Sequence, residues 1–101
     1  MYLGVDIGGT KCALILAEND GTIVYREEVA TTDVETTLDW IPGGAKRLAQ
    51  TREIRAVGIS CGGPLDSGKG LILSPPNLPG WDAVPITQML TQATGAPAYL
   101  C

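Results

Sequence analysis

The most distinctive feature of the sequence is the run Asp6-Ile7-Gly8-Gly9-Thr10-Lys11, which lies between two apolar segments. Glycines let a backbone approach an anion closely and take unusual dihedral angles, so that N–H groups can point at phosphate oxygens. Thr10 adds a hydroxyl donor and Lys11 a positive charge. Asp6 can hold a magnesium ion through water, because magnesium commonly takes one carboxylate together with phosphate oxygens. The run therefore predicts a phosphate-binding loop.

Two other interpretations of this run compete with the phosphate-binding loop, and the first of them is rejected. Gly4 to Lys11 resembles a Walker A loop with its last two residues exchanged, but such a loop must open a helix. The apolar segment from 11 to 17 is more typical of a strand. A plain β-hairpin with two glycines in its turn explains the glycines alone. It does not explain an acid that closes one strand and a Thr-Lys pair that opens the next, so we favour the phosphate interpretation.

The elements that must position this loop follow from hydrophobic periodicity and turn residues. Three sequential antiparallel strands, then a right-handed crossover to parallel strands, give an α/β fold with a mixed sheet and helices on its faces. Pro42-Gly43-Gly44 interrupts the first helix and predicts either a kink or a late start. The expected strands cover 2–7, 11–17, 22–29, 54–60, 70–73 and 96–101. One helix is expected after Asp33 and another from Pro85 to an end at Gly95, whereas 61–70 is loop-like and 74–82 is extended.

Composition excludes several classes of protein. The chain has 101 residues, 45% of them hydrophobic and 18% charged, which is typical of one globular domain. Its net charge is −4, with no basic face for nucleic acid, and no apolar run has the length of a membrane span. Histidine is absent, which excludes Ser-His and Cys-His catalytic pairs and argues against a zinc site. Cys12, Cys61 and Cys101 are expected to be buried, reduced thiols in a cytoplasmic protein.

Four stretches of the sequence together resemble, in the right order, motifs of the ROK sugar kinases (repressor, open reading frame, kinase). These glucokinase- and fructokinase-like enzymes are grouped with actin and the hexokinases. The stretches cover essentially the whole chain, so their combination is far more specific than any one of them. They are residues 6–11 (DIGGTK), 56–64 (AVGISCGGP), 73–81 (LSPPNLPGW) and 95–100 (GAPAYL).

The resemblance implies a ribonuclease H-like fold and ATP-dependent phosphorylation of a hexose such as glucose, with ATP and magnesium as cofactors. Asn77 carries an amide donor and an acceptor that can fix a sugar hydroxyl, although without the resemblance it would be a turn residue that satisfies its own backbone. In the family's pattern Asp6, Gly8, Gly9, Thr10 and Lys11 face the ATP phosphates and metal, and Gly62, Gly63 and Asn77 line the sugar pocket.

The same resemblance places the family's catalytic aspartate directly after the strand that Cys101 ends, together with its zinc cluster and second lobe. We therefore expect residues 1–101 to be the N-terminal lobe, truncated before the general base, and inactive as a kinase by itself; a homodimer is one expectation for its assembly. Asp66 and Asp82 are better explained as turn or cap residues than as a base. Trp81 is expected in core packing.

Two alternatives to the kinase remain. The first is a sugar-responsive transcriptional repressor of the ROK family. Such repressors carry a helix-turn-helix in front of this fold, whereas here Met1 runs straight into the first strand and no basic recognition helix is present. The second is a nucleotide-binding module without catalytic activity.

Overall fold

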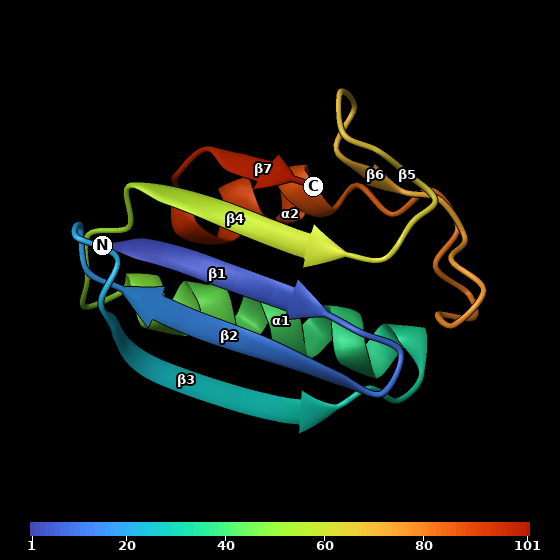
Figure 1. Ribbon diagram of the computed structural model, residues 1–101, viewed down its shortest axis with the longest axis horizontal. Coiled ribbons are helices and arrows are strands. Elements are labelled where there is room, and N and C mark those ends of the chain that lie inside the picture. Colours follow the sequence, from blue (N-terminus) through green and yellow to red (C-terminus); the bar gives the residue numbers. More distant parts are fainter.

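The computed structural model describes residues 1–101 and is built around a five-stranded mixed sheet (Figure 1). The order across the sheet is β3-β2-β1-β4-β7. Neighbouring strands are antiparallel from β3 to β1 and parallel from β1 to β7. This confirms the predicted succession of three antiparallel strands followed by parallel ones. The strands are β1 (Tyr2–Ile7), β2 (Lys11–Ala17), β3 (Ile23–Ala30), β4 (Ala56–Cys61) and β7 (Ala98–Leu100).

Two helices, α1 (Val34–Ala49) and α2 (Ile86–Thr94), lie side by side on one face of this sheet, behind it in Figure 1. Burying one large apolar side chain contributes about 1.5–3 kcal/mol, so the layer between helices and sheet dominates stability. Neither helix has the length and apolar character needed to cross a bilayer. The core between the two layers includes Leu3, Val5, Ile7, Leu14, Leu16, Val57 and Ile59 from the strands, and Ile41, Leu48, Ile86 and Leu90 from the helices.

The opposite face of the sheet carries no helix. Side chains alternate between the two faces along a strand, so the buried residues of β1 leave Tyr2, Gly4 and Asp6 on this uncovered face. Exposed Tyr99 belongs to the apolar part of the face, near the amino end of β1. Asp6 lies near the other end of β1, one residue before the strand ends, so the predicted phosphate loop begins beside the uncovered face.

Helix α1 begins earlier than one of the two predicted alternatives. The carboxylate of Asp33 accepts a hydrogen bond of 3.0 Å from the N–H of Thr36, which caps the helix directly before Val34. The helix then continues through Pro42, so a late start is wrong. A proline inside a helix costs about 3 kcal/mol. Burial of Ile41 and Leu48 at about 1.5–3 kcal/mol each offsets that cost.

The segment between β4 and α2 differs from its prediction in two ways. The short strands β5 (Leu65–Asp66) and β6 (Leu71–Ile72) pair with each other, although the region before residue 70 was expected to be loop. Residues 74–82 are not extended. They fold into a closed loop in which the N–H of Ser74 donates to the carbonyl of Trp81 at 2.8 Å. Prolines disfavour helix before them but permit turns, and burial of Leu78 and Trp81 draws the loop onto the core.

Candidate functional site

The loop of residues 8–10 joins β1 to β2 in a tight hairpin, as predicted. It is held by one internal bond, in which the N–H of Gly8 donates to the carbonyl of Lys11 at 3.0 Å. The N–H groups of Gly9 and Thr10 donate to no protein acceptor, and the exposed Thr10 hydroxyl has no partner either. Unpaired donors on a partly exposed glycine turn are what an anion needs. The loop is therefore open to solvent and is not packed shut against the core.

Asp6 stands next to this loop on the uncovered face of the sheet. Its neighbours across the strands are Ala13 on β2 and Ser60 on β4. The carboxylate is exposed and makes no ion pair or hydrogen bond within the chain. No cluster of three potential metal ligands forms. One carboxylate beside unpaired donors fits magnesium that arrives with phosphate oxygens and water, since that ion seldom uses an all-protein cage.

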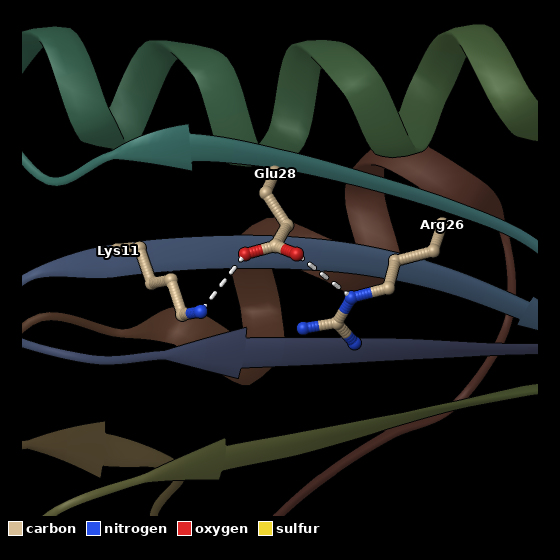
Figure 2. A network of polar contacts seen from close by, with 3 residues as sticks. All are labelled: Lys11, Arg26 and Glu28. Carbon is tan, nitrogen blue, oxygen red and sulfur yellow. Dashed lines mark hydrogen bonds and ion pairs between the residues drawn. The ribbon is translucent and has the colours of Figure 1, made fainter.

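Lys11 forms an ion pair on the same face of the sheet. Its Nζ lies 3.3 Å from one carboxylate oxygen of Glu28, whose other oxygen accepts from Nε of Arg26 at 3.1 Å. Figure 2 shows Lys11 and Arg26 on either side of this carboxylate. The hydrogen bond from Arg26, and then Lys11, hold the pKa of the Glu28 carboxyl below its usual range. The Lys11 side chain is 67% exposed, so water screens the pair. Lys11 is thus beside the loop, but its charge is shared with Glu28 rather than directed at an anion alone.

This pairing predicts that Glu28 competes with an anion for Lys11. In the full-length protein, Glu28→Gln should raise the affinity for tripolyphosphate about two- to fivefold at low salt. Calorimetry should show that this increase in affinity disappears at high salt, because the exposed charges are then screened. Glu53→Gln removes an exposed acid that forms no ion pair and is the matched control. An unchanged affinity in Glu28→Gln would contradict the competition.

Gly9 is in direct contact with Asn77, 68 positions later in the chain. A Cβ added at Gly9 would lie 2.8 Å from the carbonyl oxygen of Asn77 and 2.9 Å from both its Cβ and its Nδ2. Only glycine fits such an approach. The exposed Asn77 side chain makes no hydrogen bond within the chain, so it does not satisfy its own backbone as a turn asparagine would. Two motifs that were predicted separately therefore meet at one place.

Buried side chains hold the loop that carries Asn77, residues 74–82, against the core. Leu78 and Trp81 are only 2% and 1% exposed, which confirms that Trp81 is a core residue. Gly80 has φ of 85° and packs against Val34 at the start of α1, so a side chain there would be strained. The loop is thus fixed both to the core and to a helix, and Asn77 is held over Gly9 rather than resting there loosely.

Gly62 and Gly63 follow β4, which runs parallel to β1 with Cys61 opposite Ile7. Because both strands end at the same edge of the sheet, these glycines leave that edge beside the phosphate loop. Both are exposed, and a Cβ at Gly62 would meet no atom within 4 Å. The structure brings Asn77 onto Gly9 but leaves Gly62 uncovered.

The three cysteines are all unpaired, as predicted, and Cys12 and Cys61 are buried. Burial, followed by the neighbouring Cys12 and Asp6, raises the pKa of the Cys61 thiol to about 11. That thiol is therefore neutral near pH 7 and is a poor nucleophile or metal ligand. Cys101 is exposed, so the expectation that all three thiols are buried is wrong for this residue.

Two loop acids are engaged as turn residues, in agreement with their prediction. The Asp66 carboxylate accepts from the N–H of Lys69 at 3.0 Å. The Asp82 carboxylate accepts from the Ser74 hydroxyl. Thr31, which bonds to the loop of residues 8–10, was not predicted as a site residue, because its only local signal is a Thr-Thr-Asp run typical of a helix cap.

Comparison with known proteins bears on this site. The profile of the ROK family matches residues 2–101. A glucokinase of Thermotoga maritima is 32% identical over 101 residues, which cover 97% of this chain and 32% of that enzyme. An N-acetylmannosamine kinase of Salmonella paratyphi A is 36% identical over 97 residues, which cover 94% of this chain and 33% of that enzyme. The chain therefore spans about a third of the length of these relatives.

Solved structures agree with the sequence matches. A ROK family glucokinase from Streptomyces griseus in complex with glucose and AMPPNP has a TM-score of 0.81 and 31% identity, covering 98% of this chain and 32% of that one. A ROK family transcriptional regulator has a TM-score of 0.85 at 17% identity, and the match covers 99% of this chain and 27% of that one. That second likeness shows the fold alone. The fold class expected from the sequence, the actin and hexokinase type, is confirmed.

Proposed function

This chain belongs to the ROK family, and from that premise we propose that the protein containing it transfers a phosphoryl group from ATP to a hydroxyl of a hexose. The observation that carries the proposal is the contact between Gly9 and Asn77. It sets unpaired N–H donors for phosphate beside an unpaired amide for a sugar hydroxyl. Phosphoryl transfer depends chiefly on such positioning and on charge stabilisation. Residues 1–101 are then the N-terminal lobe of the kinase.

On the nucleotide side, the N–H groups of Gly9 and Thr10 and the Thr10 hydroxyl donate to phosphate oxygens. Gly8 has a different role, because its N–H is already used and a Cβ there would lie 2.9 Å from the carbonyl oxygen of Lys11. It shapes the turn rather than binding the anion. Lys11 supplies positive charge to the phosphates, for which it must leave its ion pair with Glu28. Asp6 would hold magnesium through water, and that ion, when bound, shields the charge of the phosphates.

On the sugar side, the Asn77 amide orients a hydroxyl, and the exposed glycines at 62 and 63 let the sugar approach the edge of the sheet. Asp66 and Asp82 are engaged in turns, so we assign the general base to neither. The proton acceptor is proposed in the part of the relatives' length that this chain does not match. The proposed substrates are glucose and N-acetylated hexoses, the classes named for the two relatives.

A coupled assay with ATP and magnesium tests this function in the full-length protein. We expect at least one of glucose and N-acetylmannosamine to be phosphorylated with kcat/KM above about 10⁴ M⁻¹s⁻¹. The 101-residue chain, assayed in parallel, should show no turnover, because the proton acceptor is proposed in the part of the relatives' length that this chain does not match. Sugar binding without turnover in the full-length protein, together with binding to DNA, would instead favour the repressor.

A further inference from the structure

Thr31, the first residue after β3, contacts the phosphate loop at two points. Its hydroxyl donates to the carbonyl of Gly8 at 2.7 Å, and its N–H donates to the carbonyl of Thr10 at 2.9 Å. The hydroxyl bond joins residues 23 positions apart, so it is a tertiary contact and not part of the hairpin. A residue outside the loop thus holds two of the loop's carbonyl groups.

The direction of these bonds determines where the loop's donors point. The carbonyl of Gly8 and the N–H of Gly9 belong to one trans peptide group and point in opposite directions. With the Gly8 carbonyl held toward Thr31, the Gly9 N–H must face the other way, where it has no protein acceptor. Glycines allow such a peptide to rotate, because both signs of φ are open to them. A rotated peptide would present a carbonyl oxygen to an incoming phosphate and repel it.

Cys12 completes the arrangement. Its Sγ lies 3.2 Å from the Thr31 hydroxyl oxygen and 3.9 Å from the Gly8 carbonyl oxygen. The Thr31 hydroxyl gives its single proton to the Gly8 carbonyl, and the thiol can donate to either of these two oxygens. The buried Cys12 side chain therefore contacts both partners of the bond between Thr31 and Gly8.

We propose that Thr31 is a positioning residue for nucleotide binding, which fixes the peptide between Gly8 and Gly9 so that the Gly9 N–H faces the phosphate. This inference rests on the proposed kinase function. Thr31 does not touch the nucleotide; it acts through the backbone of the loop. Its removal is therefore expected to weaken ATP binding selectively and to leave sugar binding without nucleotide unchanged.

The test uses the full-length protein and three variants. Thr31→Val keeps the shape and loses the hydroxyl, and should raise the KM for ATP about tenfold. Thr31→Ser restores the hydroxyl and should return the KM to within about twofold of wild type. Thr32→Val changes an exposed neighbour whose hydroxyl has no partner, and should behave as wild type. Sugar affinity measured calorimetrically without ATP should be equal in all four proteins.

The outcomes separate this inference from the proposed function. An active wild type with an unchanged KM for ATP in Thr31→Val overturns the role of Thr31 and leaves the kinase standing. An inactive wild type overturns the kinase. In that case the NMR resonance of the Gly9 amide serves as the readout. On addition of tripolyphosphate this resonance should shift in the wild-type protein and should not shift in Thr31→Val. Equal shifts in the two proteins overturn the inference. If Thr31→Val does not fold, Thr31→Ala, which also lacks the hydroxyl, replaces it, and wild-type ATP binding by Thr31→Ala overturns the inference.

Discussion

Gly9→Ala should lower kcat/KM for ATP about 100-fold and should also raise the KM for the sugar. The new methyl carbon would stand 2.8–2.9 Å from three atoms of Asn77, including its backbone carbonyl oxygen. Backbone cannot move aside as the end of a side chain can, so either the phosphate loop or the Asn77 loop must shift. Misplacement by about 1 Å in a positioned site costs about 100-fold. Steady-state kinetics in the full-length protein, with each substrate varied in turn, measures both effects.

Gly43→Ala is the matched control for this experiment. Gly43 is exposed in α1, and a Cβ there would meet no atom within 4 Å. Because alanine favours a helix interior, this variant should be more stable by about 0.5–1 kcal/mol, with unchanged kinetics. Gly9→Ala with wild-type constants for both substrates would show that the Gly9–Asn77 contact does not connect the two sites. A lower kcat/KM for ATP with an unchanged KM for the sugar would show that the phosphate loop shifts to make room for the methyl group and that Asn77 keeps its position.

Asp6→Asn should reduce kcat about 100-fold or more, because the amide keeps the shape of the side chain but loses the charge proposed to hold magnesium. The exposed carboxylate has no structural partner, so folding should not change. The magnesium dependence of the rate is the specific readout. Half-saturation should move to a higher magnesium concentration in Asp6→Asn, and the melting temperature should stay within about 2 °C of wild type.

Asp39→Asn is the control, because it removes one negative charge from an exposed side chain of α1 that forms no ion pair. It should have normal activity and a normal magnesium requirement. If Asp6→Asn and Asp39→Asn behave alike, Asp6 has no part in the reaction. If Asp6→Asn loses activity without a change in its magnesium dependence, the carboxylate acts in some way other than through the metal.

The strands and turns were predictable because local signals agree with tertiary packing there. The bounds expected for 2–7 and 11–17 are those of β1 and β2, since apolar runs bordered by glycine or Asn-Asp-Gly leave little freedom. Gly95 ends α2 in the left-handed conformation that glycine favours, as expected. The hairpin turn at residues 8–10 was predictable for the same reason, because the residues proposed to bind phosphate there are contiguous in sequence.

The contacts that complete the site were not predictable, because they join distant residues. Nothing near Thr31 indicates that its hydroxyl reaches back to Gly8, and nothing in DIGGTK indicates that Asn77 will rest on Gly9. The ion pair of Lys11 with Glu28 depends on cross-strand pairing of β2 and β3. The prediction that residues 74–82 are extended was wrong for a related reason. Burial of Trp81 closes this proline-rich segment into a loop, whereas its local preferences alone would leave it extended.

The most direct test of the account is a crystal structure of the full-length protein with magnesium and a non-hydrolysable ATP analogue. The account predicts that the N–H groups of Gly9 and Thr10 each lie about 3 Å from a phosphate oxygen. It also predicts that Asn77 still packs on Gly9. Phosphates bound elsewhere, with both N–H groups facing solvent, would contradict it.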